Sequence, residues 1–281
     1  FPDDALHDPH QGVPPPIEYD PGEFKIAMPE GDLFLGNAYQ EYLVAPGQER
    51  KAILRRYAEI VSQAEVSAPM TWDEARPNLM VRVRERAYLE SLRLLAEERD
   101  GEACEQPMAR VLTDHLFYGL VLDFPHSMRT VSGHDLAEWE VSLEDAYGIA
   151  LQNLRDRTPE GFEPIQPGLY RSTWQDDYDS ARLLLPEVIA GASVQGDPVA
   201  MAPNHNILLL TGSEDNDGLA RMAAIAEGIL GEPRPMSGFA VRWDGQRWVS
   251  FMPPETSPAH TPLKKVALMS LAYDYQCQKE M

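Results

Sequence analysis

Two histidines and an aspartate near the middle of the chain are the residues best suited to metal-assisted chemistry. Asp123 and His126 are followed closely by His134, and neutral imidazoles with carboxylate oxygens are ligands of divalent metals that activate water for hydrolysis. Their spacing matches no established metal motif, and Pro125 and Gly133 indicate turns in which Asp and His serve as turn and cap residues. A structural role is therefore favoured, and a metal-dependent hydrolase is the alternative.

His205 is a further candidate for acid–base chemistry. It lies in Asn204-His205-Asn206 between two apolar segments, where polar side chains could face a pocket and an imidazole titrates in a useful range. A hairpin tip of Asn and His explains the same residues equally well. The sequence has no Gly-rich phosphate loop, no nucleophile elbow and no cysteine cluster for zinc, so we expect no cofactor and no bound metal.

Arg242 and Arg247 are candidates for an anion-binding pair. Asp244-Gly245 between two apolar segments predicts a two-residue hairpin turn, which would place Arg242 directly opposite Arg247. Like charges in that arrangement are unfavourable, so a negative group is expected between them. An intramolecular carboxylate is the favoured group in so acidic a chain, and a bound anion is the alternative.

The charge of the chain is large and unevenly distributed. It has 45 Asp and Glu against 24 Lys and Arg, a formal net charge of −21. Residues 111–198 carry 15 acidic and 5 basic residues, and residues 1–47 carry 9 and 1. Such a surface repels nucleic acid and anionic membranes and speeds encounter with basic partners.

This acidity, without a recognisable catalytic constellation, predicts a non-enzymatic protein-binding module that engages a basic protein partner. An immunity or inhibitor protein for a basic toxin fits this description, and so does an adaptor. Asp176, Asp177 and Asp179 lie together in a charged loop and are the expected partner-binding residues. Solubility conferred by the charge alone is the competing interpretation.

The elements that must position these residues alternate between helices and strands without a regular βαβ period. Capping boxes begin helices at Thr71 and Ser142, and apolar runs at 199–202 and 207–211 predict paired strands. The acidic segment 175–179 is expected to join two strands, 169–174 and 180–185, as a hairpin loop, whereas 79–96 fits either a strand or a helix. The pattern predicts an α+β fold with mainly antiparallel sheets and amphipathic helices packed on them.

Three regions are expected. Residues 1–22 predict an extended, acidic, Pro-rich arm, residues 23–110 a region of helices and strands, and residues 111–281 an α+β region that could be continuous with 23–110. No apolar run approaches the roughly 18 residues that cross a bilayer, and only Cys104 and Cys277 are cysteines. A soluble cytoplasmic protein with reduced thiols is therefore expected, although a chain that opens at Phe1 leaves a removed leader open.

Three segments in order carry a resemblance to a known family. They are Gly36–Tyr39 ahead of the predicted helix from Gln48, Leu143–Leu154 with its Ala-x-x-Asn-Leu end, and Pro198–Leu210, an apolar strand after a proline loop. In this order the chain resembles the YtpQ-like family of uncharacterised bacterial proteins over most of residues 24–252. The resemblance implies a cytoplasmic bacterial α+β protein and supplies no catalytic residues.

Overall fold

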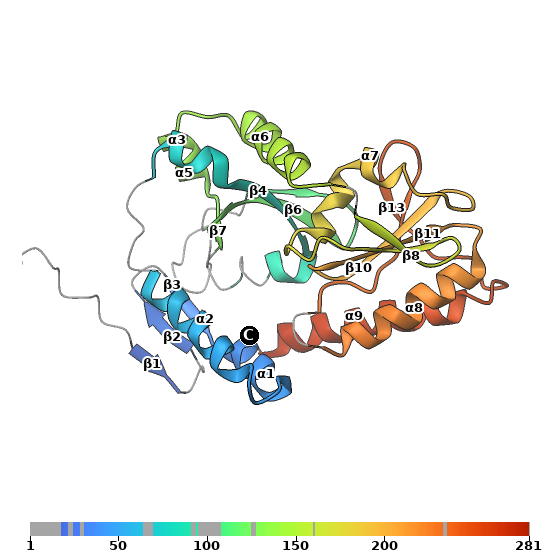
Figure 1. Ribbon diagram of the computed structural model, residues 1–281, viewed down its shortest axis with the longest axis horizontal. Helices are drawn as coiled ribbons and strands as arrows, with labels where there is room; N and C mark the ends of the chain where they lie inside the picture. The colour runs from blue at the N-terminus through green and yellow to red at the C-terminus, as the bar shows by residue number, and fades with distance from the viewer. Residues whose placement is uncertain are drawn as a thin grey trace, which may run out of the picture. The chain divides into compact units, whose positions relative to one another are not determined.

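The computed structural model describes residues 18–21, 25–28, 31–63, 70–90, 94, 108–124, 128–159, 161–232 and 235–280. Helices and antiparallel sheets are mixed in these residues, which confirms the predicted α+β class. The chain divides into two compact units (Figure 1). The first comprises Phe1–Met70 with Pro125–Ser127, and the second comprises Thr71–Phe124 with Met128–Met281. Residues 71–110, which the sequence analysis placed in one region with residues 23–70, thus belong to the second unit.

The first unit combines a three-stranded antiparallel sheet with two helices that pack on each other. Tyr57 is buried, and its hydroxyl donates to Glu41, which also pairs with Arg56. Of the predicted N-terminal arm only residues 18–21 are described, and most of these form a strand. The elements are β1 (Glu18–Asp20), β2 (Lys25–Met28), β3 (Gly31–Phe34), α1 (Gly36–Val44) and α2 (Arg50–Gln63).

In the second unit, the long strand β6 pairs with β4 on one side and with β5 and β7 on the other. Helix α6 packs on β4, and the predicted Ser142 cap begins it. The segment 79–96 resolves into strand β4 followed by helix at 86–90. The elements are α3 (Trp72–Ala75), η2 (Arg76–Asn78), β4 (Leu79–Glu85), β5 (Ala109–Val111), β6 (Leu116–Asp123), β7 (Met128–Thr130), α5 (Gly133–Glu138) and α6 (Leu143–Asp156).

The rest of this unit is a six-stranded antiparallel sheet with two helices on it. Figure 1 shows α8 and α9 side by side, and they enclose the main apolar core against β10 and β11. Both central strands are buried throughout most of their length, as their apolar sequences predict. The elements are β8 (Phe162–Gln166), β9 (Leu169–Ser172), η3 (Asp179–Leu184), α7 (Pro186–Ile189), β10 (Pro198–Asn204), β11 (Ile207–Gly212), α8 (Asn216–Leu230), β12 (Val241–Trp243), β13 (Trp248–Ser250) and α9 (His260–Glu280).

One predicted hairpin is wrong, and another has a different register. Residues 180–184, expected as part of the strand 180–185, belong to the 3-10 helix η3, so segment 175–179 joins a strand to a helix. In the β12–β13 hairpin, Trp243 pairs with Trp248 and Arg242 with Val249. The connection is four residues long because the Asp244 carboxylate accepts the backbone N–H groups of Gln246 and Arg247. No described helix is long and apolar enough to cross a membrane.

Candidate functional site

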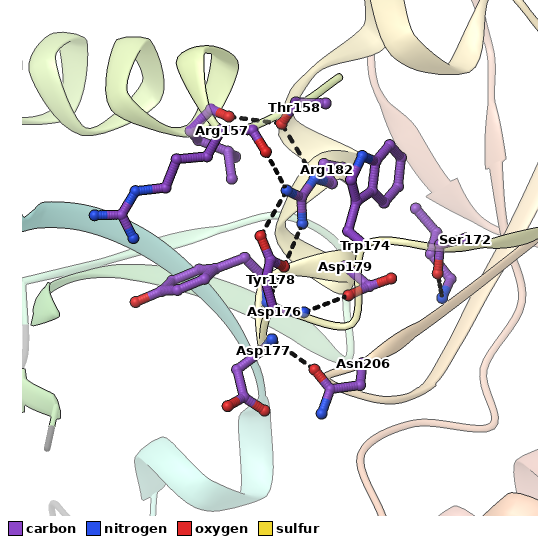
Figure 2. Close-up of polar contacts among 12 residues, drawn as sticks. Arg157, Thr158, Ser172, Trp174, Asp176, Asp177, Tyr178, Asp179, Arg182 and Asn206 are labelled. Atoms are coloured by element: carbon purple, nitrogen blue, oxygen red, sulfur yellow. Dashed lines mark hydrogen bonds and ion pairs between the residues drawn. The ribbon is translucent and has the colours of Figure 1, made fainter. Parts of the chain in front are cut away.

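Arg182 lies at the centre of a buried polar cluster in the second unit (Figure 2). Its side chain has no exposed surface and forms a bidentate ion pair with Asp176, at 2.7 and 2.8 Å. Its Nε donates to Thr158 Oγ1 at 3.1 Å, and Nη2, which also binds Asp176, donates to the Arg157 carbonyl at 3.0 Å. The indole of Trp174 lies 4.3 Å from the guanidinium carbon. Every nitrogen of Arg182 is therefore satisfied within the protein, and this group is structural.

The Arg182 cluster fixes the acidic segment 175–179 in a strained shape. Gln175 and Asp177 have positive φ angles of 52° and 65°, a conformation that side chains other than Gly adopt at a cost. The Asp177 N–H donates to Asn206 Oδ1, and the Tyr178 N–H donates to Asp176 Oδ1 at 3.1 Å. Figure 2 shows these groups converging on one turn.

The three expected partner-binding aspartates have different environments. Asp177 is exposed, as a contact residue must be. Asp176 is committed to Arg182, whose hydrogen bonds hold its pKa below the ordinary range against the opposing effect of burial. Asp179 has no exposed surface, and burial raises its pKa. The exposed acidic face predicted from this segment thus reduces to Asp177, because Asp179 is buried and Asp176 is neutralised internally.

A cavity of about 180 Å³ lies on the face of β4 that is turned away from α6. Tyr118, which pairs with Val83 across the sheet, contacts Tyr147 of α6, so α6 covers the face that carries Val83. Side chains alternate between the two faces of a strand. Arg82 and Arg84 therefore share the opposite face, where both line the cavity.

Arg82 is the unusual group in this cavity. Its pKa is lowered to about 10, chiefly by burial and also by the nearby charge of Arg84, while Asp177 acts in the opposite direction. Its Nη1 donates to the Met128 thioether at 2.6 Å, and its buried Nε has no partner among the described residues. A thioether is a weak acceptor, so the described part of the chain supplies no carboxylate bonded to this guanidinium.

Arg84 is held by aromatic groups in place of a carboxylate. Its guanidinium carbon lies 4.6 Å from the centre of the Tyr88 ring, a cation–π distance. Its Nη1 lies 2.9 Å from Nε2 of His205. Because a guanidinium only donates hydrogen bonds, His205 must accept here, and its proton lies on Nδ1 when the ring is neutral.

Those predicted catalytic residues that the structure describes do not converge. Asp123 pairs with Arg157 at 2.6 Å, and His134 lies on the exposed face of α5 at 3.3 Å from Glu138. His126 lies outside the described residues. His205 is 8% exposed and contacts Arg84. Within the described ranges, no group of three His, Cys, Asp or Glu residues is placed to hold a metal ion.

Each arginine of the predicted anion-binding pair has its own carboxylate. Arg242 binds Asp197 at 2.8 Å, and the Nε of Arg247 lies 3.9 Å from Asp244. The expected opposition of Arg242 and Arg247 is wrong, because the four-residue turn places Val249 across from Arg242. The favoured intramolecular carboxylate is present for Arg242, and it comes from the loop before β10.

Sequence reasoning did not select Arg82, Arg84 or Arg182 as site residues. The alternation of Val81 and Val83 with the two arginines carried a signal, since one buried face leaves both arginines together on the other. No sequence pattern marked Arg182, because its partners at 157–158 and 176 lie on other elements. No family model, curated protein or solved structure compared with the chain matches it, so the resemblance to the YtpQ-like family stays a prediction.

Proposed function

We propose that this protein is a non-enzymatic binding protein that holds a small anionic ligand in the cavity lined by Arg82 and Arg84. The observation that carries the proposal is that the partly buried Arg82 and Arg84 both line this cavity, and no carboxylate of the described residues forms an ion pair with either guanidinium. An acidic chain has many carboxylates that could pair with a buried arginine. The ion pair of Arg182 with Asp176 is an example.

The energetics of burial support a ligand. A buried cation without a partner costs several kcal/mol, and proteins normally pair it or replace it. Arg82 and Arg84 also repel each other, since the charge of Arg84 lowers the pKa of Arg82. An anion in the cavity would remove both costs at once, so the free protein is expected to gain stability when one binds.

Calorimetric titration with two probe anions, benzoate and inorganic phosphate, tests this function. We expect one equivalent of at least one probe to bind, and Arg82→Met to weaken that binding at least tenfold. The same substitution should raise the melting temperature of the ligand-free protein, because it removes a desolvated charge and keeps the side-chain length. Arg242→Gln is the matched control, since Arg242 has its own carboxylate, and it should leave probe binding unchanged.

Two results would overturn the proposal. One is the absence of binding by either probe at millimolar concentration. The other is probe binding that survives Arg82→Met, which would place the anion elsewhere. Asp177→Asn adds a directional check: its carboxylate favours the charged state of Arg82, so its neutralisation should tighten anion binding.

The acid excess supports a second function, engagement of a basic protein partner through the turn that carries Asp177. That turn is held by Arg182 and Asn206 in a strained conformation with the Asp177 carboxylate exposed. Pull-down from the native cell with the parent protein, followed by Asp177→Asn, tests it. A basic partner whose association rate falls at low salt in the variant would support this function. An unchanged rate would exclude this turn as the contact.

A further inference from the structure

We infer that Met128 is a site of reversible oxidation, at which hydrogen peroxide converts the thioether to a single epimer of the sulfoxide and the new oxygen accepts a hydrogen bond from Arg82. This inference goes beyond the proposed function and does not depend on an anionic ligand. Three features carry it: the position of Met128 in the sheet, its contact with Arg82, and its exposure to the cavity.

The sheet places Met128 beside Arg82. Met128 of β7 pairs with Asp123 of β6, and Arg82 of β4 pairs with Gly119 of the same central strand. Paired residues share a face of a sheet, and so do residues that are an even number of positions apart on one strand. Met128 and Arg82 therefore lie on one face, on opposite sides of β6, although 46 positions separate them in the sequence.

The contact between these side chains joins a strong donor to a weak acceptor. Arg82 Nη1 lies 2.6 Å from the Met128 sulfur, and the described residues supply no carboxylate bonded to this guanidinium. The nearby Asp123 is already paired with Arg157. A thioether accepts a hydrogen bond only weakly, whereas the oxygen of a sulfoxide is polar. Oxidation of Met128 thus gives a partly buried cation a better partner, which stabilises the oxidised form in the folded protein.

Met128 is accessible to a small oxidant. Its side chain is partly exposed and lines the cavity of about 180 Å³. By contrast, Met80 and Met201 in the neighbouring strands have no exposed surface. Peroxide that enters the cavity therefore reaches Met128 while these two core methionines stay protected.

The reaction transfers one oxygen atom. A lone pair of the Met128 sulfur attacks one oxygen of hydrogen peroxide, and the S–O bond forms as the O–O bond breaks. The released hydroxide takes the remaining proton of the transferred OH group and leaves as water. The thioether is oxidised by two electrons, and the peroxide is reduced by two. A sulfoxide reductase that draws electrons from a thiol reverses the step.

Arg82 makes the product a single epimer. A thioether sulfur has two lone pairs, and oxygen added to one or to the other gives opposite configurations at sulfur. Nη1 of Arg82 lies against one of them, so peroxide reaches the other. The unbranched methionine side chain has three rotatable bonds, and its rotation brings the new oxygen to the guanidinium.

Peroxide treatment of the full chain, followed by tryptic digestion, tests the stereochemistry. Met128 is the only methionine of peptide 111–129, and Met252 is the only one of peptide 248–264. Reductases that act on one epimer each then distinguish the two products by mass. We expect one epimer to exceed the other at least fivefold at Met128, and similar amounts of both at Met252, which is 42% exposed. Arg82→Leu should abolish the preference at Met128.

Met128→Gln tests the hydrogen bond without oxidation. The amide oxygen of glutamine is a good acceptor on a side chain of similar length. We expect this variant to melt at least about 2 °C above the parent. Met252→Gln is the matched control and should leave the melting temperature unchanged. In a protein that also carries Arg82→Leu, Met128→Gln should give no gain, because the donor has been removed.

Several outcomes would overturn the inference. They are equal amounts of the two epimers at Met128 in the folded parent, resistance of Met128 to peroxide that oxidises Met252, and a Met128→Gln variant that melts no higher than the parent. If Arg82→Leu fails to fold, oxidation of the parent in urea replaces it, since unfolding removes the same contact. A preference that persists in urea would show that Arg82 does not direct the reaction. All of these measurements are made without an anion, so they leave the proposed function to its own test.

Discussion

Arg182 and Asp176 form a two-pronged ion pair around a guanidinium that has no exposed surface. The pair joins η3 to the turn that precedes it, and Thr158 and the Arg157 carbonyl tie the same guanidinium to the end of α6. Two elements that are distant in sequence are thereby locked to one turn. This ion pair and its neighbouring hydrogen bonds stabilise the strained backbone at Gln175 and Asp177.

Asp176→Asn should destabilise the protein strongly. Removal of the carboxylate charge leaves a buried guanidinium without its counterion, which costs about 3–5 kcal/mol. Urea unfolding at pH 7 measures the loss. Glu187→Gln is the matched control, because it breaks a similar arginine pair at 2.8 Å whose side chains are 43% and 52% exposed, and exposed pairs contribute about 1 kcal/mol or less. Equal losses in the two variants would contradict the structural role of Asp176.

Gly161→Ala should also destabilise the protein, by about 1–3 kcal/mol. A Cβ at Gly161 would overlap the indole of Trp174, and that ring covers Arg182 while its Nε1 donates to the Pro159 carbonyl at 2.8 Å. The matched substitution is Gly148→Ala in α6, where nothing lies within 4 Å of the new methyl group. That variant should be stabilised by about 0.5–1 kcal/mol, because alanine favours a helix over glycine. Destabilisation of similar size at both positions in thermal unfolding would count against the packing of Trp174.

Elements defined by their own sequence were predictable. The paired strands β10 and β11 are apolar runs bounded by turn residues, and the Thr71 and Ser142 caps form hydrogen bonds with Glu74 and Asp145, three residues ahead. The interactions that form these elements lie within a few residues of one another, so a short stretch of sequence is enough to predict them.

Elements decided by distant partners were not predictable. Ser180–Leu185 is a mainly apolar segment of strand length, and its sequence alone favours a strand. In the fold, Arg182 binds Thr158, which precedes β8, and Asp176, which follows β9, and most of the segment forms η3. The register of the β12–β13 hairpin depended on one side chain, since Asp244 accepts two backbone donors and lengthens the turn. For the candidate site, alternation places Arg82 and Arg84 together, but which carboxylates lie nearby is a property of the folded chain.

The contact between Arg84 and His205 predicts a specific tautomer. The guanidinium donates to Nε2 across 2.9 Å, so the neutral ring carries its proton on Nδ1. Long-range ¹H–¹⁵N correlation spectra of the histidine side chains measure this directly. We expect the Nδ1–H form in the parent protein and a shift toward the other tautomer in Arg84→Leu, which removes the donor. An Nε2–H ring in the parent would exclude the hydrogen bond and with it the anchoring of Arg84.

Asp274 of α9 should make stability fall as the pH rises toward neutrality. Burial raises its pKa from near 3.8 to about 6, and its charge in turn raises the pKa of Glu85, which is itself buried. The folded state therefore binds the Asp274 proton more tightly than the unfolded state does. Its contribution is fully present below the ordinary pKa and is lost as the pH rises to about 6.

Asp274→Asn removes this dependence, because the amide is neutral at every pH. Relative to the parent, the variant should gain free energy of unfolding at pH 7.5 and gain little at pH 3.5, where Asp274 is protonated in both states. Chemical unfolding of both proteins at the two pH values measures the difference. The same gain at both values would mean that the substitution acts through packing, and that the carboxylate of Asp274 is as well solvated in the folded protein as in the unfolded chain.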